Sequence, residues 1–170
     1  HEAGLERGGL AGTGHAVALD AGLGLGDREL DRGRQVDPDD LVVVQHGEIL
    51  TWHGQAAEGA GWILKAMRLN PYHPERFWSH LGRAYFVARR YGEALEAFKH
   101  VAVPDAAVLA FIAACRARLG DLPAAQARVK ELLARSPPFA LAEYLATLHY
   151  RHAGDREHHV ESLALAGLTQ

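Results

Sequence analysis

Four prolines of this chain recur at a fixed interval. Pro38, Pro71, Pro104 and Pro137 lie 33 residues apart. A period of this length is typical of repeat proteins, in which each unit is one supersecondary element that stacks on its neighbours. The period constrains the fold more than any single motif does.

Each interval between the prolines has the same internal pattern. An apolar stretch with helical spacing is followed by a break and then by a second such stretch. The breaks fall at Gly54, at Tyr91–Gly92 and at Gly120–Asp121. The pattern therefore predicts units of two antiparallel helices joined by a tight turn, and an all-α fold.

The middle unit carries a set of residues at the spacing of a known repeat. They are Trp78, Leu81, Gly82, Tyr85, Ala94, Phe98 and Pro104. This unit resembles the tetratricopeptide repeat, a helix–turn–helix of 34 residues. The flanking units match in part, with Gly47 in the first, where Gly59 replaces the usual alanine, and Gly120 in the third. The resemblance implies a right-handed superhelix of antiparallel helix pairs, an α-solenoid.

The small and the bulky residues of this pattern have different expected roles. Gly82 and Ala94 are expected where the two helices of the middle unit approach most closely. A larger side chain there would push the helix axes apart, at a cost of about 1–3 kcal/mol. The bulky residues are expected to fill the space between helices: Trp78, Leu81, Tyr85 and Phe98.

The chain divides into three parts on this pattern. Residues 39–138 are predicted to form three such units, and residues 139–170 a capping helix pair of the kind that open arrays need at their ends. In that pair we expect a break at Gly154–Asp155, with Asp155 as an N-cap, and a helix end at Gly167. Residues 1–38 are predicted to be a degenerate unit with a frayed first helix, because they hold half of the 18 glycines.

The C-terminal half has a narrower resemblance. The stretches AMRLNPYHPERFWSHLGRAYFVARRYGEALEAFKH, VLAFIAACRARLGD and ESLALAGL resemble the tetratricopeptide region that follows a class III adenylate/guanylate cyclase domain or a winged-helix domain in certain bacterial regulatory proteins. The sequence contains neither a β-rich region nor a pair of metal-binding Asp residues set in one. The resemblance thus implies a sensory or interaction module, and since residue 1 is His, a further domain is expected upstream.

Charge and cysteine content exclude several classes of function. The net charge of -3 and the pI of about 6.4 predict no basic face, and therefore no nucleic-acid partner. The chain has no run of about 18 apolar residues, so no membrane span is expected. The single cysteine, Cys115, is expected in the core of a protein in a reducing compartment, and a cytoplasmic location follows.

The sequence predicts no active site, metal site or cofactor. Ser79 and His80 are neighbours on a helix and point to different faces. The acidic pair Asp39–Asp40 lies at an expected helix start. The Gly22, Gly24 and Gly26 series lacks the strand and the Lys-Ser/Thr of a phosphate loop. The histidines with spacing closest to that of a metal site are His149, His152, His158 and His159, which are expected at the surface of the capping pair.

The remaining candidate is the groove that the first helices of such units line. By the family pattern, the groove residues are Leu41, Val44 and Glu48, then Arg76, Ser79, Arg83 and Phe86, then Ala107, Ala110, Ala114 and Ala117. Arg76 and Arg83 could bind a carboxylate or phosphate of a peptide, with Phe86 as an apolar wall.

The expected function is therefore that of a non-catalytic module that binds a protein or peptide partner. Two alternatives stay open. The chain could be the regulatory region of a multidomain nucleotide cyclase or transcription regulator. It could also be a self-association module, because the terminal units of an open array leave apolar faces that can pair between copies.

Overall fold

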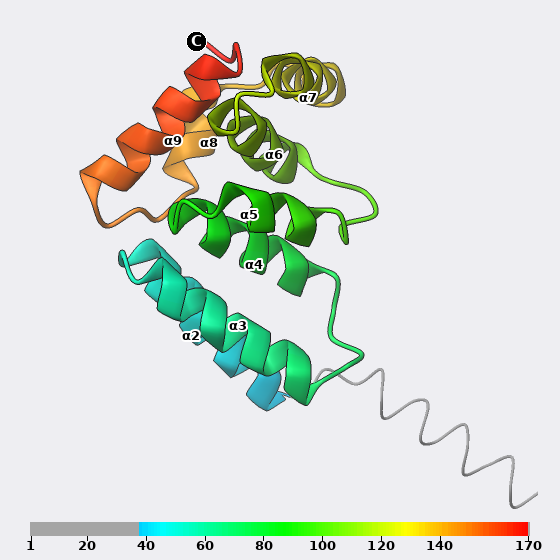
Figure 1. The fold of residues 1–170 in the computed structure, drawn as a ribbon, viewed down its shortest axis with the longest axis vertical. Coiled ribbons are helices and arrows are strands. Elements are labelled where there is room, and N and C mark those ends of the chain that lie inside the picture. The colour runs from blue at the N-terminus through cyan, green and yellow to red at the C-terminus, as the bar shows by residue number, and fades with distance from the viewer. Residues whose placement is uncertain (1–37, 170) are drawn as a thin grey trace, which may run out of the picture. The chain divides into compact units, whose positions relative to one another are not determined.

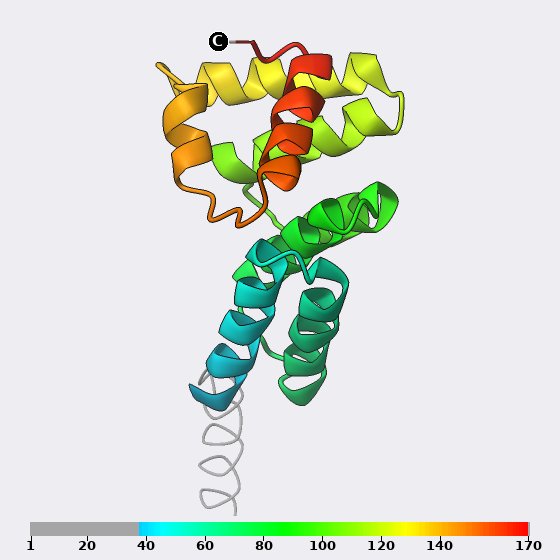
Figure 2. The same ribbon diagram turned by 90° about the vertical axis from the view of Figure 1, so that its left-hand side faces the viewer.

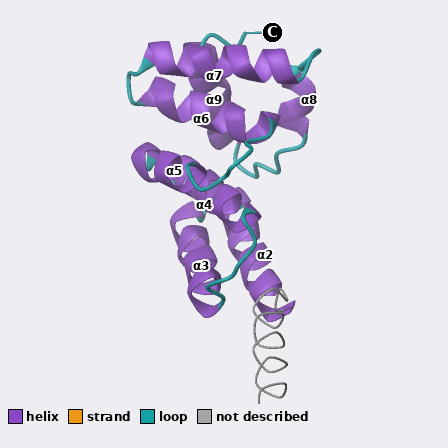
Figure 3. Cartoon of the chain, turned by 90° about the vertical axis from the view of Figure 1, so that its right-hand side faces the viewer, coloured by secondary structure: helices purple, strands orange, loops and turns teal. Residues whose placement is uncertain are grey.

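The computed structural model describes residues 38–169, and the predicted degenerate unit over 1–38 lies almost wholly outside this range. The described residues form eight α-helices and no strand (Figure 3). The all-α prediction is confirmed for this part of the chain. None of its helices is both long enough and apolar enough to cross a membrane.

Six of the helices pack as three consecutive pairs, which can be followed in Figure 1. They are α2 (Pro38–Trp52) with α3 (Ala56–Leu69), α4 (Arg76–Val87) with α5 (Tyr91–Phe98), and α6 (Ala106–Arg118) with α7 (Leu122–Arg135). Each pair packs on the next, because α3 contacts α4 and α5 contacts α6. The first helices of the pairs also touch in sequence, α2 against α4 and α4 against α6.

The turns inside the pairs use left-handed backbone. Gly54 has φ of 86° and Gly120 has φ of 82°, so both predicted glycine breaks are confirmed. The predicted break at Tyr91–Gly92 is wrong, because these two residues begin α5. The left-handed residue of that turn is Arg89, with φ of 65°. Its side chain stabilises the turn by donating a hydrogen bond from Nη1 to the carbonyl of Val87 at 2.8 Å.

Glycine permits the close approach of helices inside the first two pairs. A Cβ on Gly47 would lie 2.7 Å from the carbonyl oxygen of Gly59, and one on Gly59 would lie 2.5 Å from that of Gly47. The alanine usual at position 59 would therefore clash with α2. In the second pair a Cβ on Gly82 would lie 2.5 Å from the ring of Phe98, and Ala94 is fully buried. The expected close approach at Gly82 is confirmed.

The bulky residues of the middle unit lie at the junctions between helices. Leu81 and Phe98 are buried. Tyr85 is half-buried and packs against both apolar clusters of the core. Trp78 is also half-buried, and its ring stacks on that of His100 with 3.9 Å between centroids.

The last two helices depart from the repeat. Helix α8 (Leu141–Ala146) is short, residues 147–152 are not helical, and α9 (Ala153–Leu165) packs mainly against α6. The predicted break at Gly154–Asp155 is wrong, since both residues lie in the first turn of α9, where Asp155 is paired with Arg89. The predicted end at Gly167 is confirmed by its φ of 89°. We call residues 141–168 the C-terminal clasp.

Candidate functional site

The predicted groove residues fall into two groups. Arg76 is exposed, and Leu41, Glu48, Ser79, Arg83 and Ala107 are half-buried. The others have no access to solvent that a ligand could use: Val44, Phe86, Ala110, Ala114 and Ala117. The accessible part of the surface thus lies mainly on α2 and α4.

A charged cluster occupies this accessible part. The Nδ1 atom of His80 lies 3.2 Å from Oε1 of Glu48, and Nη1 of Arg83 lies 3.9 Å from the same oxygen. His80, and to a lesser degree Arg83, holds the pKa of the Glu48 carboxyl below its usual value, against the opposing effect of burial. Glu48 is therefore an anion at neutral pH, fixed on α2 and facing α4.

The Arg83 side chain contains a hydrogen-bond donor, the buried Nε atom, that has no acceptor among the described residues. Its guanidinium carbon lies 5.9 Å from the centroid of the Phe111 ring. A buried donor without an acceptor is costly, whereas an arginine fork binds a carboxylate or phosphate through two hydrogen bonds at once. The Arg83 side chain is 20% exposed, so an anionic ligand can reach the solvent-facing part of the guanidinium, whereas the Nε atom itself is covered.

The C-terminal clasp covers the other part of the predicted groove. The ring of His159 lies 4.8 Å from the ring of Phe86 and 4.5 Å from that of Phe111, centroid to centroid. Phe86 is fully buried as a result. The ring that was predicted as an apolar wall of the groove is therefore shielded from water in this structure, packed against Phe111 on α6 and His159 on α9.

Polar contacts hold the edges of the clasp. Arg118 on α6 donates from Nε to Oγ of Ser162 at 2.7 Å and from Nη2 to Oε2 of Glu161 at 2.9 Å. Arg89 pairs with Asp155 at 2.8 Å. These contacts fix α9 along α6 and bind it to the turn between α4 and α5.

The loop between α8 and α9 reaches the first helix pair. The backbone N–H of Arg151 donates to the carbonyl of Trp52 at 2.9 Å, and the rings of Tyr150 and Trp52 meet edge to face at 5.0 Å. Figure 2 shows this loop in orange close to the end of α2. The clasp therefore links the third helix pair directly to the first.

Of the four histidines that the sequence placed at the surface of the capping pair, His149 and His152 are exposed and His158 is half-buried, but His159 is not at the surface. His159 is fully buried, with the Tyr150 hydroxyl 2.9 Å from Nδ1 and the Tyr144 hydroxyl 3.5 Å from Nε2. Burial lowers the pKa of His159 to about 3, and burial with nearby arginines lowers that of His158 to about 4. Both rings are neutral at pH 7. Within residues 38–169 no three His, Cys, Asp or Glu side chains gather as metal ligands would.

A sequence signal for His159 existed. The residue shares a helical stripe with three buried neighbours at spacings of three, four and seven: Ser162, Leu163 and Ala166. Such a stripe predicts that His159 faces the core, but it does not predict its hydrogen bonds to Tyr144 on α8 and to Tyr150 in the loop before α9.

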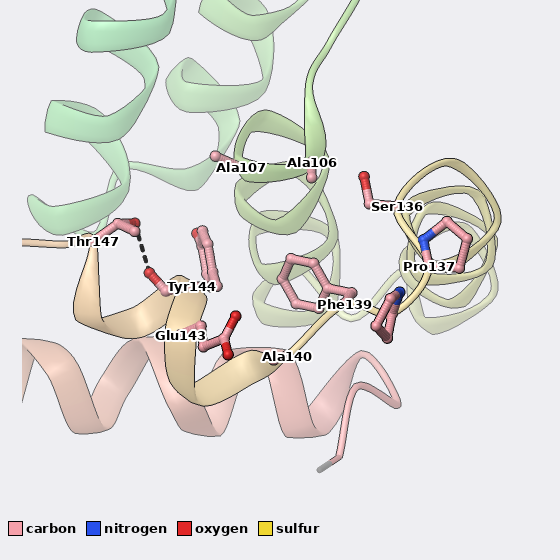
Figure 4. A pocket seen from close by; sticks show the side chains of 10 residues that line it. Ala106, Ala107, Ser136, Pro137, Phe139, Ala140, Glu143, Tyr144 and Thr147 are labelled. Carbon is pink, nitrogen blue, oxygen red and sulfur yellow. Dashed lines mark hydrogen bonds between the residues drawn. The ribbon is translucent and has the colours of Figure 1, made fainter.

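An open cavity of about 440 Å³ lies at the root of the clasp (Figure 4). The start of α6 contributes Ala106 and Ala107, and the chain from Ser136 to Ala140 forms another wall. Glu143 and Tyr144 on α8 complete it. The cavity adjoins the predicted groove at Ala107 and is mostly apolar.

Cys115 has no role at this surface. It is a free, buried thiol on α6, and burial raises its pKa. Its expected place in the core is confirmed.

The described residues form an all-α protein of stacked helix pairs with a C-terminal clasp. No protein-family model matches the chain, and no curated protein matches its sequence.

Proposed function

We propose that this chain is a tetratricopeptide-type α-solenoid that binds a peptide or a partner helix and catalyses no reaction. The binding surface is the accessible part of the groove, formed by Glu48 on α2 and by Arg76, Ser79 and Arg83 on α4. The observation that carries the proposal is the Arg83 guanidinium, which is 20% exposed and whose Nε has no acceptor among the described residues.

The order of helix contacts supports a superhelical array. Three pairs stack in sequence, and their first helices α2, α4 and α6 form a continuous row. The equal proline spacing and the small residues at the Gly47–Gly59 and Gly82 crossings are in keeping with one repeated packing geometry. In such an array the row of first helices lines the concave face.

The charges of the surface favour a ligand with an anionic group. Arg83 would bind a carboxylate or phosphate, and Arg76, which is exposed about two turns earlier on α4, would add a second cation. Glu48 stays 3.9 Å from Arg83, beyond hydrogen-bonding distance, so it orients the guanidinium without saturating it. Glu48 would also favour ligands that carry a hydrogen-bond donor next to their anionic group.

Selection of a displayed peptide library on the immobilised chain tests the proposal. The test variant is Arg76→Glu/Arg83→Glu, and the matched control is Arg68→Glu/Lys130→Glu, which changes the same charge at exposed positions of α3 and α7. Peptides enriched in Asp, Glu or a free carboxylate should bind the wild type and the control and should be lost with the test variant. Failure to enrich any peptide, or equal binding to all three proteins, would contradict the proposal. Phe86 is left unchanged because it is buried.

A further inference from the structure

We propose that the C-terminal clasp covers the part of the groove that α4 and α6 form. A partner binds to this part only after the clasp has moved away from it. The inference rests on the proposed function, because it concerns the regulation of the same surface. It assigns to α8 and α9 a role beyond that of the capping pair that the sequence predicted.

The first step is the identity of the covered residues. The repeat pattern directs Phe86 on α4 and Ala110, Ala114 and Ala117 on α6 toward the groove. All four are buried. Helix α9 lies against α6 and supplies the ring of His159 beside Phe86 and Phe111. A segment of the same chain thus sits where a bound helix of a partner would sit.

The second step concerns the contact between the clasp and the helices that it covers. This contact has the composition of a protein–protein interface. Its centre is apolar and comes from buried side chains of the clasp: Tyr144, Leu145, Leu163, Ala166 and Leu168. Its rim consists of ion pairs with solvent access, Arg89 with Asp155 and Arg118 with Glu161. An apolar centre inside a polar rim is the usual arrangement between separate proteins, and exposed ion pairs contribute little each.

The third step is the weak attachment of the clasp at its root. Residues 136–140 connect it to α7 and border the open cavity of about 440 Å³ (Figure 4). Helix α8 has only six residues. Segments outside regular helices open more readily than the helices they join, and residues 136–140 and 147–152, on either side of α8, are not helical.

The covered surface also indicates which ligand fits it. The ring of His159 occupies the place beside Phe86 and Phe111, and Ser162 and Glu161 present a hydroxyl and a carboxylate to Arg118. The matching ligand is an amphipathic helix with an aromatic or imidazole ring and an acidic residue two or three positions further along.

The experiment uses a synthetic, fluorescently labelled peptide of residues 139–169 as the probe, because these residues cover the surface in the intact chain. The full chain is compared with the variant Asp155→Ala/Glu161→Ala, which removes the two rim carboxylates. The control is Glu96→Ala/Glu131→Ala, which removes two carboxylates from ion pairs on α5 and α7. The rim variant should bind the peptide about tenfold more tightly than the wild type and the control. Equal binding by the three proteins, or no binding by any, would overturn the proposal.

Hydrogen exchange of the unmodified chain gives a second test that does not depend on a variant. Amides of α9 should exchange faster than amides of α6 under native conditions. Loss of protection by both helices in a single step would overturn the proposal. Neither test involves Arg76 or Arg83, so a failure of the clasp proposal and a failure of the proposed function are distinguishable.

Discussion

The imidazole ring of His159 lies 4.5 Å from the phenyl ring of Phe111, and both side chains are fully buried. This contact joins α9 to the first helix of the third pair. The adjoining loop carries Tyr150, which meets Trp52 at the end of α2. In an open solenoid each unit contacts only its neighbours, so this link joins the first and third pairs in a way that the repeats alone would not.

Gly82→Leu is expected to destabilise the chain strongly. A Cβ at this position would lie 2.5 Å from the ring of Phe98, and the larger side chain would force α4 and α5 apart. Overpacking of this kind costs about 1–3 kcal/mol, which urea unfolding followed by circular dichroism would measure. Gly61→Ala is the control, because a Cβ there has no atom within 4 Å and alanine favours the helix by about 1 kcal/mol. Unchanged stability of Gly82→Leu would contradict the packing described here.

Phe86→Ala is expected to destabilise the fold by about 3–5 kcal/mol, because it leaves a cavity between α4, α6 and α9. Arg76→Ala, at an exposed position of the same helix, should change stability by less than about 0.5 kcal/mol. Thermal unfolding of the two variants separates the roles of these residues. Similar melting temperatures for both would show that Phe86 lies at the surface after all.

The buried His159 predicts a loss of stability in acid. Its pKa is about 3 in the folded chain and near the ordinary 6.5 in the unfolded chain. Between these values the unfolded state binds more protons, so the free energy of unfolding falls as the pH is lowered from 6.5 toward 3. The slope approaches about 1.4 kcal/mol per pH unit from this residue.

The variant His159→Gln isolates this effect. It removes the titrating group, and its stability should therefore depend less on pH over the same window, although its stability at pH 7 is lower because the tyrosine hydrogen bonds are disturbed. Urea unfolding at several pH values gives both curves. Parallel curves for wild type and variant would assign the acid sensitivity to other groups.

Asp105→Ala is expected to cost about 1 kcal/mol of stability. The carboxylate of Asp105 is the N-cap of α6 and accepts a hydrogen bond from the backbone N–H of Val108 at 2.8 Å. Asp105→Asn keeps an acceptor in place and should recover most of the loss. If the asparagine variant were as unstable as the alanine variant, the negative charge of Asp105, and not its capping hydrogen bond, would account for the stability it contributes.

The helix pairs could be predicted because their signals are local. Gly54 and Gly120 adopt the left-handed backbone that glycine permits, so both turns were visible in the sequence. The turn at Arg89 could not be predicted from the sequence. The Arg89 side chain stabilises it through hydrogen bonds to the Val87 carbonyl and to Asp155, and Asp155 lies 66 residues away. The α8–α9 boundary was missed for a related reason, because the loop is held by Trp52.

The candidate surface could be predicted only in part. Helical spacing indicates which face of α4 a side chain occupies, and it placed Arg83 and Phe86 on the same face. It carries no information on what packs over that face. Arg83 keeps access to solvent, whereas Phe86 is covered by His159 from a distant segment.

The central claim is that the Arg83 guanidinium binds an acidic group of a ligand. NMR of the arginine Nε–H groups tests this claim most directly. Titration of the chain with a selected acidic peptide should shift the Arg83 Nε–H signal, assigned with Arg83→Lys, because the guanidinium to which this group belongs binds the acidic group of the peptide. The signal of Arg68, exposed on α3, should stay in place. A peptide that binds while the Arg83 signal remains unchanged would contradict the account.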